Sequence, residues 1–414
     1  MQPADRLHAL DAVRAYALLL GVVLHSAAAF LEDFKIPIWR DDPSAGAAVL
    51  YYVIHMFRMS AFFLIAGFFA RMLVERRGVS AFVKDRLKRV GVPLVLFGPF
   101  VLVFISVGFV LGALPHGVEY LTQVAQQQQE SAVAQAAEQP AGALGGLNTA
   151  HLWFLYYLLI FYALALAIRA IVSAVDKQEL LARTADRVLA FVMRGVWAPV
   201  LVALPIAVYL YQRQSWVEWL GLPAPFALTP DVMALVGYGM AFGLGWLVNR
   251  QVRLLLELEK FWVVYLVAAV ALAAFCLATI GTTPLWAGPN LAGTDRLLYT
   301  AAYTVGLWCF VFGFVGAAVK FLSDPHPVTR YLADASYWVY LMHMATVIFF
   351  VTLLNPYDWH WTLKLAITVG GSMPILLLTY HYLVRFTWIG AILNGRRHPR
   401  PEKSPPPDPA PARG

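Results

Sequence analysis

Long apolar stretches recur along this chain, and they constrain its fold more than any other feature. The hydrocarbon core of a bilayer is about 30 Å thick, which a helix of roughly 20 residues crosses. We therefore predict an all-α, polytopic membrane protein. Its transmembrane helices, about ten in number, are expected in the ranges 9–30, 47–73, 90–113, 150–172, 196–212, 231–249, 261–281, 297–320, 334–354 and 363–385.

The composition agrees with a membrane protein. Of the 414 residues, 60% are hydrophobic and only 13% are charged, whereas soluble domains average about 25% charged residues. So few ionic groups could not cover a water-soluble surface of this size. The net charge of +7 is then explained by a basic collar at the cytoplasmic membrane surface. Such a collar favours anionic membrane lipids as partners, and no nucleic acid is expected to bind.

The distribution of Lys and Arg predicts the orientation. Cytoplasmic segments of membrane proteins carry an excess of these residues. With the N-terminus inside, only five of the 31 fall in outside segments: Lys35, Arg40, Arg213, Arg296 and Lys364. Both termini are therefore expected in the cytoplasm. The stretch 9–30 is too long for the apolar core of a cleavable signal, so it is expected to be the first transmembrane helix.

Two parts of the chain are distinguished by composition. Residues 1–390 are predicted to form the transmembrane bundle, and residues 391–414 a disordered, basic, proline-rich cytoplasmic tail. The loop from about 114 to 149 has no Lys or Arg and is expected outside. Cys276 and Cys309 lie in apolar stretches without the spacing of a disulfide framework or a zinc site, so no metal is predicted.

Ionisable residues within the predicted helices are the candidates for function. An Arg, Lys or Asp in the hydrocarbon costs at least ~2.5–3.5 kcal/mol, so each requires a partner, water or a functional role. The set is short: Asp11, Arg14, His25, His55, Arg58, His151 and His343, with His381 nearer the inner end of the last helix.

Helical geometry predicts how these residues are arranged. Arg14 and His25 are eleven residues apart, so they share one face and lie about 16 Å apart along the axis. Asp11 can pair with Arg14, and His55 shares a face with Arg58 near the depth of His25. Four histidines and Arg58 are expected at mid-to-outer depth. The inner depth is expected to hold a basic group: Arg14, Arg86, Lys88 and Arg89.

Structural roles are the alternative for most of these residues. A single histidine within a membrane helix is often a packing residue, and Arg86, Lys88 and Arg89 also suit a topology-setting collar. Arg58 is harder to explain in this way, because an arginine so deep is rare. Peripheral arginines and the pair Asp41-Asp42 are expected to be solvated. Six tryptophans near helix ends are expected to lie in the interfacial belt, with a role as substrate platforms as the second choice: Trp39, Trp153, Trp216, Trp219, Trp286 and Trp388.

Several segments resemble, in the same order, motifs of the membrane acyltransferase-3 family. They are Arg14 and His25 with ten residues between them, IHMFRMSAFFLIAGFF at 54–69, RLKRVGVP at 86–93, HLWFL at 151–155 and ASYWVYLMHM at 335–344. The resemblance spans roughly residues 6–390. It is greatest to the branch of the family that succinylates osmoregulated periplasmic glucans.

The resemblance implies a ten-helix bundle of the bacterial inner membrane that takes an acyl group from cytoplasmic acyl-CoA. The donor is succinyl-CoA or acetyl-CoA, with no permanently bound cofactor, and the acceptor is a hydroxyl of a periplasmic glucan or another glycan. His25 is implied to be catalytic, and Arg14, Arg86 and Arg89 to bind CoA. The chemistry of these side chains agrees, because a neutral histidine suits a general base and arginines suit phosphates.

The remaining candidates complete the predicted site. Arg58 and His55 are expected beside His25 in the catalytic group. Arg58 would either stabilise the thioester oxyanion or pair with the carboxylate of a succinyl group. His151, Trp153 and His343 are expected on the substrate-binding side.

Other functions stay open from the sequence. A glycan or lipid-linked sugar transporter would also place polar groups at mid-membrane, although no repeat or matching pair of broken helices is found. A scaffolding bundle would leave Arg58 and the deep histidines without a role. Direct transfer and transfer through an acyl-histidine are both compatible with these residues.

Overall fold

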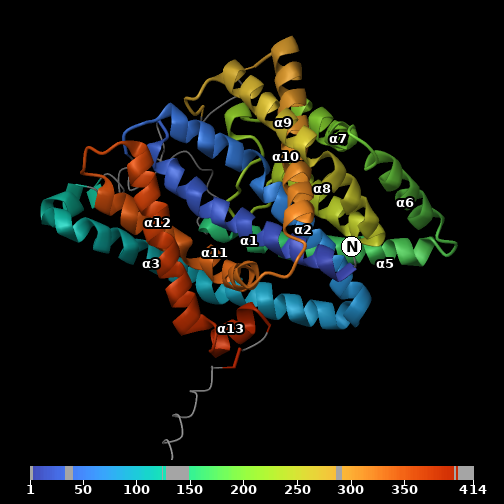
Figure 1. Ribbon diagram of the computed structural model, residues 1–414, viewed down its shortest axis with the longest axis horizontal. Coiled ribbons are helices and arrows are strands. Elements are labelled where there is room, and N and C mark those ends of the chain that lie inside the picture. The colour runs from blue at the N-terminus through green and yellow to red at the C-terminus, as the bar shows by residue number, and fades with distance from the viewer. Residues whose placement is uncertain are drawn as a thin grey trace, which may run out of the picture.

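The computed structural model describes residues 3–32, 41–123, 125–126, 149–285, 291–395 and 398–399, with the backbone alone for residues 3–7. Within these ranges the regular secondary-structure elements are all helices (Figure 1). The predicted all-α class is therefore confirmed. The first half contains α1 (Pro3–Ala27), η1 (Ala28–Phe30), α2 (Ala45–Arg86), η3 (Leu87–Gly91), α3 (Val92–Ala113), η4 (Leu114–His116), η5 (Ala150–Leu152), α5 (Trp153–Val175) and α6 (Leu180–Val192).

The second half continues the same architecture. It contains α7 (Ala198–Gln212), η6 (Glu218–Leu220), α8 (Val232–Val248), η7 (Asn249–Leu254), α9 (Leu255–Ile280), α10 (Gly293–Phe321), α11 (Pro327–Leu354), α12 (Trp361–Thr379), η8 (Tyr380–Val384) and α13 (Trp388–Leu393).

The chain is a multi-pass membrane protein by the length and apolar character of its helices. Seven continuous helical stretches in the described ranges are long and apolar enough to cross a membrane. Two of them, Ala45–Gln123 and Val232–Ile280, are 79 and 49 residues long and each include more than one helix. Ala198–Gln212 is a shorter apolar helix. Each of the ten predicted ranges falls on a helix, while the number of crossings and the orientation stay predictions.

Helix α2 extends well beyond the predicted range 47–73. It continues to Arg86, and its only non-helical residue is Gly78, with φ of +80°. Glycine adopts this conformation without the steric cost that a Cβ would bring. The predicted cytoplasmic loop with its basic residues is therefore a helical extension of α2 that turns at Gly78.

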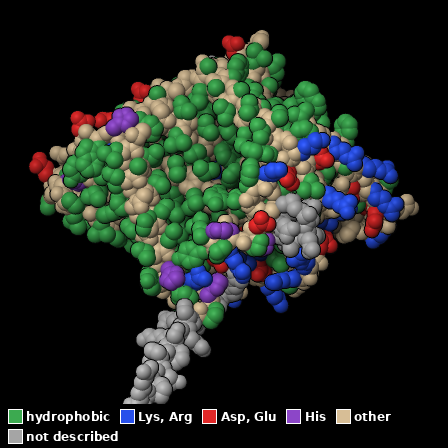
Figure 2. Space-filling view, in the orientation of Figure 1, with side chains coloured by type: hydrophobic (Ala, Val, Ile, Leu, Met, Phe, Trp, Pro, Cys, Tyr) green, Lys and Arg blue, Asp and Glu red, His purple; other side chains and the backbone are tan. Residues whose placement is uncertain are grey.

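Helices α1 and α10 form the centre of the bundle. In the most apolar 18-residue stretch of α10, 83% of the residues are buried, whereas in that of α5 only 17% are buried. Helix α1 packs against α2, α10, α11 and α12 and runs through the middle of the view in Figure 1. The peripheral helices expose large apolar side chains such as Val95, and hydrophobic residues cover most of the face seen in Figure 2. This surface suits contact with lipid.

Close helix contacts are made at glycines. A Cβ at Gly67 of α2 would meet the backbone carbonyl of Phe242 in α8, and one at Gly245 of α8 would meet that of Leu64. Small residues are common where membrane helices approach each other closely, because lipid provides no hydrophobic drive for their association. The α2–α8 contact therefore depends on the absence of side chains at these two positions.

Some expectations fall on residues outside the described ranges. They concern Lys35, Trp39, Arg40, Trp286, the glutamine run from 127 onward and most of the predicted tail. Helix α13 ends at Leu393, three residues into the range 391–414 that was expected to be disordered. The disorder of residues 400–414 stays a prediction.

Candidate active site

Three histidines from distant parts of the chain meet inside the bundle. His25 lies on the last turn of α1, His151 on η5, and His343 in the middle of α11. The ring centroids of His25 and His343 are 5.1 Å apart, and those of His343 and His151 are 5.0 Å apart. The structure thus brings together three of the histidines that the sequence placed at mid-to-outer depth, with His343 between the other two.

Backbone carbonyls fix the proton on two of these rings. His343 Nδ1 lies 2.8 Å from the carbonyl oxygen of Tyr340, and a carbonyl only accepts, so Nδ1 carries the hydrogen. His151 Nε2 lies 3.2 Å from the carbonyl oxygen of Leu341 and is assigned as a donor in the same way. The remaining nitrogens, His343 Nε2 and His151 Nδ1, are buried and have no hydrogen-bond partner in the described residues. Each neutral ring therefore has a basic nitrogen available inside the site.

Arg58 lies against α1 one turn before His25. A Cβ at Gly21 would overlap the guanidinium of Arg58, so the absence of a side chain at Gly21 makes room for it. Arg58 is within electrostatic range of His25, His55, His151 and His343. Its Nε is buried and makes no hydrogen bond to any described residue. An arginine in such a position suits a negatively charged group of a substrate or transition state.

His55 belongs to the same region through an aromatic stack. Its ring lies 5.5 Å from that of Tyr51, and Tyr51 lies 5.9 Å from Trp219, with both pairs tilted by only 13°. His25, His55 and Arg58 each keep part of their surface accessible, whereas His151 and His343 are buried. The accessible members are therefore those that a substrate can reach first.

The predicted CoA-binding arginines form a second group beside the middle of α1, about three turns before His25. Arg89 lies within electrostatic range of Arg14 and Arg86. Arg14 pairs with Asp11 at 3.3 Å, as predicted, and also donates to the carbonyl of Ala333. Because α1 is continuous from Pro3 to Ala27, the backbone positions of Arg14 and His25 are separated by about 16 Å along its axis.

A π-helical turn, η3, holds Arg89 in this group. The carbonyl of Arg89 accepts a 2.6 Å hydrogen bond from the hydroxyl of Tyr337, and its Nε donates to the carbonyl of Leu393. Asp85 pairs with Arg86 at 2.8 Å and with Arg89 at 3.9 Å. π-helical turns within α-helices are frequent at functional sites, because they redirect side chains. Here the turn ties the basic segment to α11 and α13.

Trp153 is not part of the histidine group. Its side chain is 5% exposed and packs between Phe63 and Tyr238. The expectation of interfacial belt positions was wrong for Trp153, Trp216 and Trp219, because all three are buried in the bundle. Trp388, by contrast, is exposed. Tertiary contacts between helices, rather than position near a helix end, decide which tryptophans face the membrane surface.

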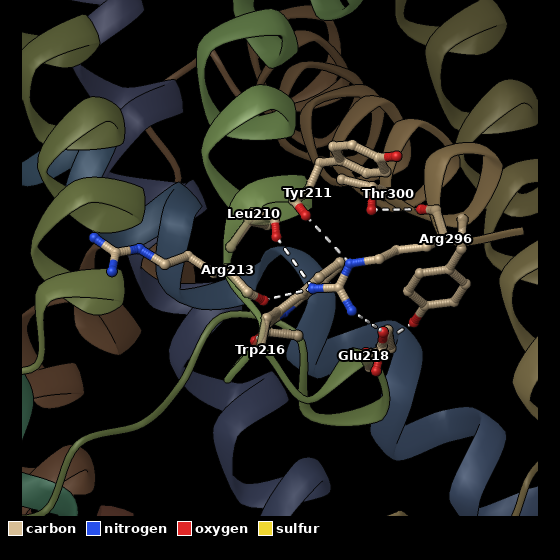
Figure 3. A network of polar contacts seen from close by, with 9 residues as sticks. Leu210, Tyr211, Arg213, Trp216, Glu218, Arg296 and Thr300 are labelled. Atoms are coloured by element: carbon tan, nitrogen blue, oxygen red, sulfur yellow. Dashed lines mark hydrogen bonds and ion pairs between the residues drawn. The ribbon is translucent and has the colours of Figure 1, made fainter. Parts of the chain in front are cut away.

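A buried ion pair near the aromatic stack was missed by the sequence reasoning. Arg296 was expected in a solvated outside segment, but its guanidinium pairs with Glu218 at 2.9 Å, and their side chains are 6% and 1% exposed (Figure 3). Arg296 also donates to the carbonyls of Tyr211 and Arg213. Glu218 immediately precedes Trp219, so this network fixes the loop that carries the stack to His55.

A second buried ion pair corrects the expectation for Asp41. The Nζ of Lys364 lies 2.7 Å from Asp41 Oδ1, and the two side chains are 3% and 5% exposed. Burial raises the pKa of Asp41, although the hydrogen bond from Lys364 acts in the opposite direction. Both pairs join residues far apart in the sequence, so spacing along the chain gave no signal for them.

The described residues contain no group of three or more His, Cys, Asp or Glu side chains placed to hold a metal ion. What they do contain is a set of neutral imidazoles beside one arginine, and a separate group of three arginines. The first group suits proton transfer next to developing negative charge. The second suits the phosphates of a nucleotide.

Comparison with known proteins gives an independent result. A family profile described as an acyltransferase domain matches residues 7–381. The chain is similar to glucans biosynthesis protein C of Escherichia coli strain SMS-3-5, with 25% identity over 99% of both chains. It is also similar to glucans biosynthesis protein C of E. coli O157:H7 strain EC4115, with 24% identity over the same share. No solved structure matches the chain significantly.

Proposed function

The chain belongs to the membrane acyltransferase-3 family, and from this premise we propose that it transfers a succinyl group from cytoplasmic succinyl-CoA to a hydroxyl of a periplasmic glucan. The membrane is the bacterial inner membrane. The similarity to glucans biosynthesis proteins supports a glucan as the acceptor. The group of Arg14, Arg86 and Arg89 supports CoA as the donor, and the histidines with Arg58 support acyl transfer.

His25 is the general base in this proposal. It takes the proton of the acceptor hydroxyl as the oxygen attacks the thioester carbonyl carbon. The tetrahedral oxyanion forms beside Arg58, whose guanidinium stabilises the negative charge. When the intermediate collapses, the C–S bond breaks and the CoA thiolate takes the proton from the His25 imidazolium. His55, on the same face of α2 as Arg58, is the second histidine accessible to the acceptor.

The arginines grouped around Arg14 hold the donor. Arg14, Arg86 and Arg89 bind the phosphates of CoA with forked, charge-assisted hydrogen bonds. The separation of about 16 Å between Arg14 and His25 is comparable with the length of an extended pantetheine arm. The nucleotide therefore stays at the cytoplasmic end while the thioester reaches His25.

His151 and His343 complete the acceptor side. Their protons are fixed by backbone carbonyls, so their basic nitrogens lie inside the site, and His343, whose ring lies next to that of His25, assists this base. The observation that carries the proposal is the convergence of His25, His343 and Arg58 within a membrane bundle of this family.

Acyl-CoA turnover by the purified protein tests the proposal. The full chain in nanodiscs is given succinyl-CoA or acetyl-CoA with a periplasmic glucan, and free CoA and acylated glucan are measured. We expect turnover with succinyl-CoA that is lost in His25→Ala. Turnover with acetyl-CoA but not with succinyl-CoA would refute succinyl-CoA as the donor. Folded protein that binds and consumes neither donor would favour a transporter.

A further inference from the structure

A basic pocket lies between the amphipathic helix α6 and the turn η7, and its lining shares no residue with the histidine group or the group of Arg14, Arg86 and Arg89. Its volume is about 630 Å³, and three arginines line it, Arg194, Arg250 and Arg253, together with Gln251 and Glu257. Figure 2 shows Lys and Arg side chains gathered toward the side of the molecule where α5 and α6 lie in Figure 1. None of the pocket residues takes part in the proposed transfer.

One pair of contacts fixes the shape of this pocket. Arg250 forms a bidentate ion pair with Asp186 of α6, with a distance of 2.6 Å from Nη2 to Oδ2. Hydrogen bonds from Arg250 hold the pKa of Asp186 below its usual range. Gln251 donates to the carbonyl of Asp186 at 2.8 Å and has non-helical backbone angles, φ of −131° and ψ of 63°. The pocket wall is therefore built by specific contacts between α6 and η7.

The other two arginines leave their charges uncompensated. Arg194 and Arg253 are exposed and form no ion pair with any described residue. Arg250 is neutralised by Asp186, and Glu257 contributes the one carboxylate of the lining. The lining therefore carries a net positive charge.

Exposed apolar side chains lie close to Arg194 along the chain. Phe191 at the end of α6 is 73% exposed and Trp197 after it is 68% exposed, on either side of Arg194. Leu180, Leu181 and Val188 of α6 are also exposed. A helix with one polar and one exposed apolar face is typical of segments that lie in the membrane interface.

We propose that this pocket binds the phosphate headgroup of an anionic phospholipid. Arg194 and Arg253 donate to the phosphate oxygens, and the acyl chains lie along Phe191 and Trp197. A free phosphate or CoA would satisfy the arginines alone. The exposed apolar side chains on either side of Arg194 in the sequence favour a ligand that is both anionic and apolar, and basic pockets at the cytoplasmic surface commonly bind such headgroups.

Lipid titration of the full-length protein tests this assignment. The detergent-purified protein is titrated with dioleoylphosphatidylglycerol, and bound lipid is counted by native mass spectrometry. Dioleoylphosphatidylcholine, inorganic phosphate and CoA are titrated separately. The variants are Arg194→Gln, Arg253→Gln and their combination. Arg187→Gln is the matched control, because Arg187 is an exposed arginine of α6 outside the pocket.

We expect one tight phosphatidylglycerol site that weakens about tenfold for each pocket arginine removed, as the loss of a charge-assisted hydrogen bond predicts. Arg187→Gln should keep the site, and both pocket variants should keep the melting temperature of the lipid-free protein, because their side chains are exposed. Equal affinity in the double variant and the control would overturn the proposal. Binding of CoA or phosphate that depends on these arginines, without a preference for phosphatidylglycerol, would also overturn it.

Discussion

The imidazoles of His25 on α1 and His343 on α11 lie with their ring centroids 5.1 Å apart, and the hydrogen on His343 Nδ1 points to the carbonyl of Tyr340. The basic Nε2 of His343 is thereby held inside the site. A histidine in this state is suited to assist the base that takes the acceptor proton, and such assistance contributes typically 10²–10⁴-fold to a rate.

We expect His343→Gln to lower acyl transfer by about 10²-fold or more, because glutamine fills the space but cannot accept and return a proton. The rate is measured as CoA release at saturating donor. The control is His326→Gln, since His326 is an exposed histidine at the start of the same helix, and its rate should match the wild type. A rate for His343→Gln within twofold of the control would remove His343 from the chemistry.

Gly21→Ala should impair catalysis without unfolding the protein. The added methyl group occupies the space of the Arg58 guanidinium, which is the flexible end of a side chain and therefore moves. A displacement near 1 Å in an active site costs up to about 10²-fold in rate, so we expect a loss between about tenfold and 10²-fold. In Gly243→Ala the new Cβ meets no atom within 4 Å, and activity should persist. Unchanged turnover in Gly21→Ala would show that the position of Arg58 is unimportant.

Glu218→Ala should destabilise the protein strongly, because it leaves Arg296 buried without its counter-charge. Removing one partner of a buried ion pair typically costs about 3–5 kcal/mol. The free energy of unfolding is measured in detergent, with Glu179→Ala as the control. Glu179 pairs with Arg183 at 3.8 Å on the surface, so its loss should have no measurable effect. Equal stability of the two variants would contradict the burial of the Glu218–Arg296 pair.

Gly67→Ala should separate α2 from α8. The new Cβ would collide with the backbone of Phe242, which cannot move as a side chain does. Overpacking of this kind costs typically about 1–3 kcal/mol. Gly370→Ala in α12 meets no neighbour within 4 Å and serves as the control. A melting temperature for Gly67→Ala as high as that of the control would disprove the close approach.

Asp186→Asn should show a pH-dependent loss of stability. Hydrogen bonds from Arg250 lower the pKa of Asp186 in the folded protein. The stabilisation is therefore complete above the unfolded value of about 3.9 and is lost as pH falls through the lower folded value. At pH 7 we expect the substitution to cost about 0.2–1 kcal/mol, since the pair is partly exposed. Melting temperatures of the two proteins should converge as the pH falls below about 3.9 and through the lower folded pKa of Asp186, if the charge is responsible. A difference that stays constant throughout this fall in pH would instead indicate a packing effect.

The sequence by itself determined the fold class and the helix positions. Ten apolar ranges fall on helices, because helices within a membrane are decided by local hydropathy and by the need to satisfy the backbone internally. The spacing of Arg14 and His25 on one continuous helix also followed from local geometry alone.

Tertiary structure decided which side chains meet. His25, His151 and His343 come from three elements whose contacts depend on helix packing, and no local pattern encodes that packing. Arg296 and Lys364 were expected at the surface, yet they are buried with Glu218 and Asp41. A charged residue in a loop has the same local sequence whether it faces water or a distant carboxylate. Only the folded bundle determines which of these two environments surrounds it.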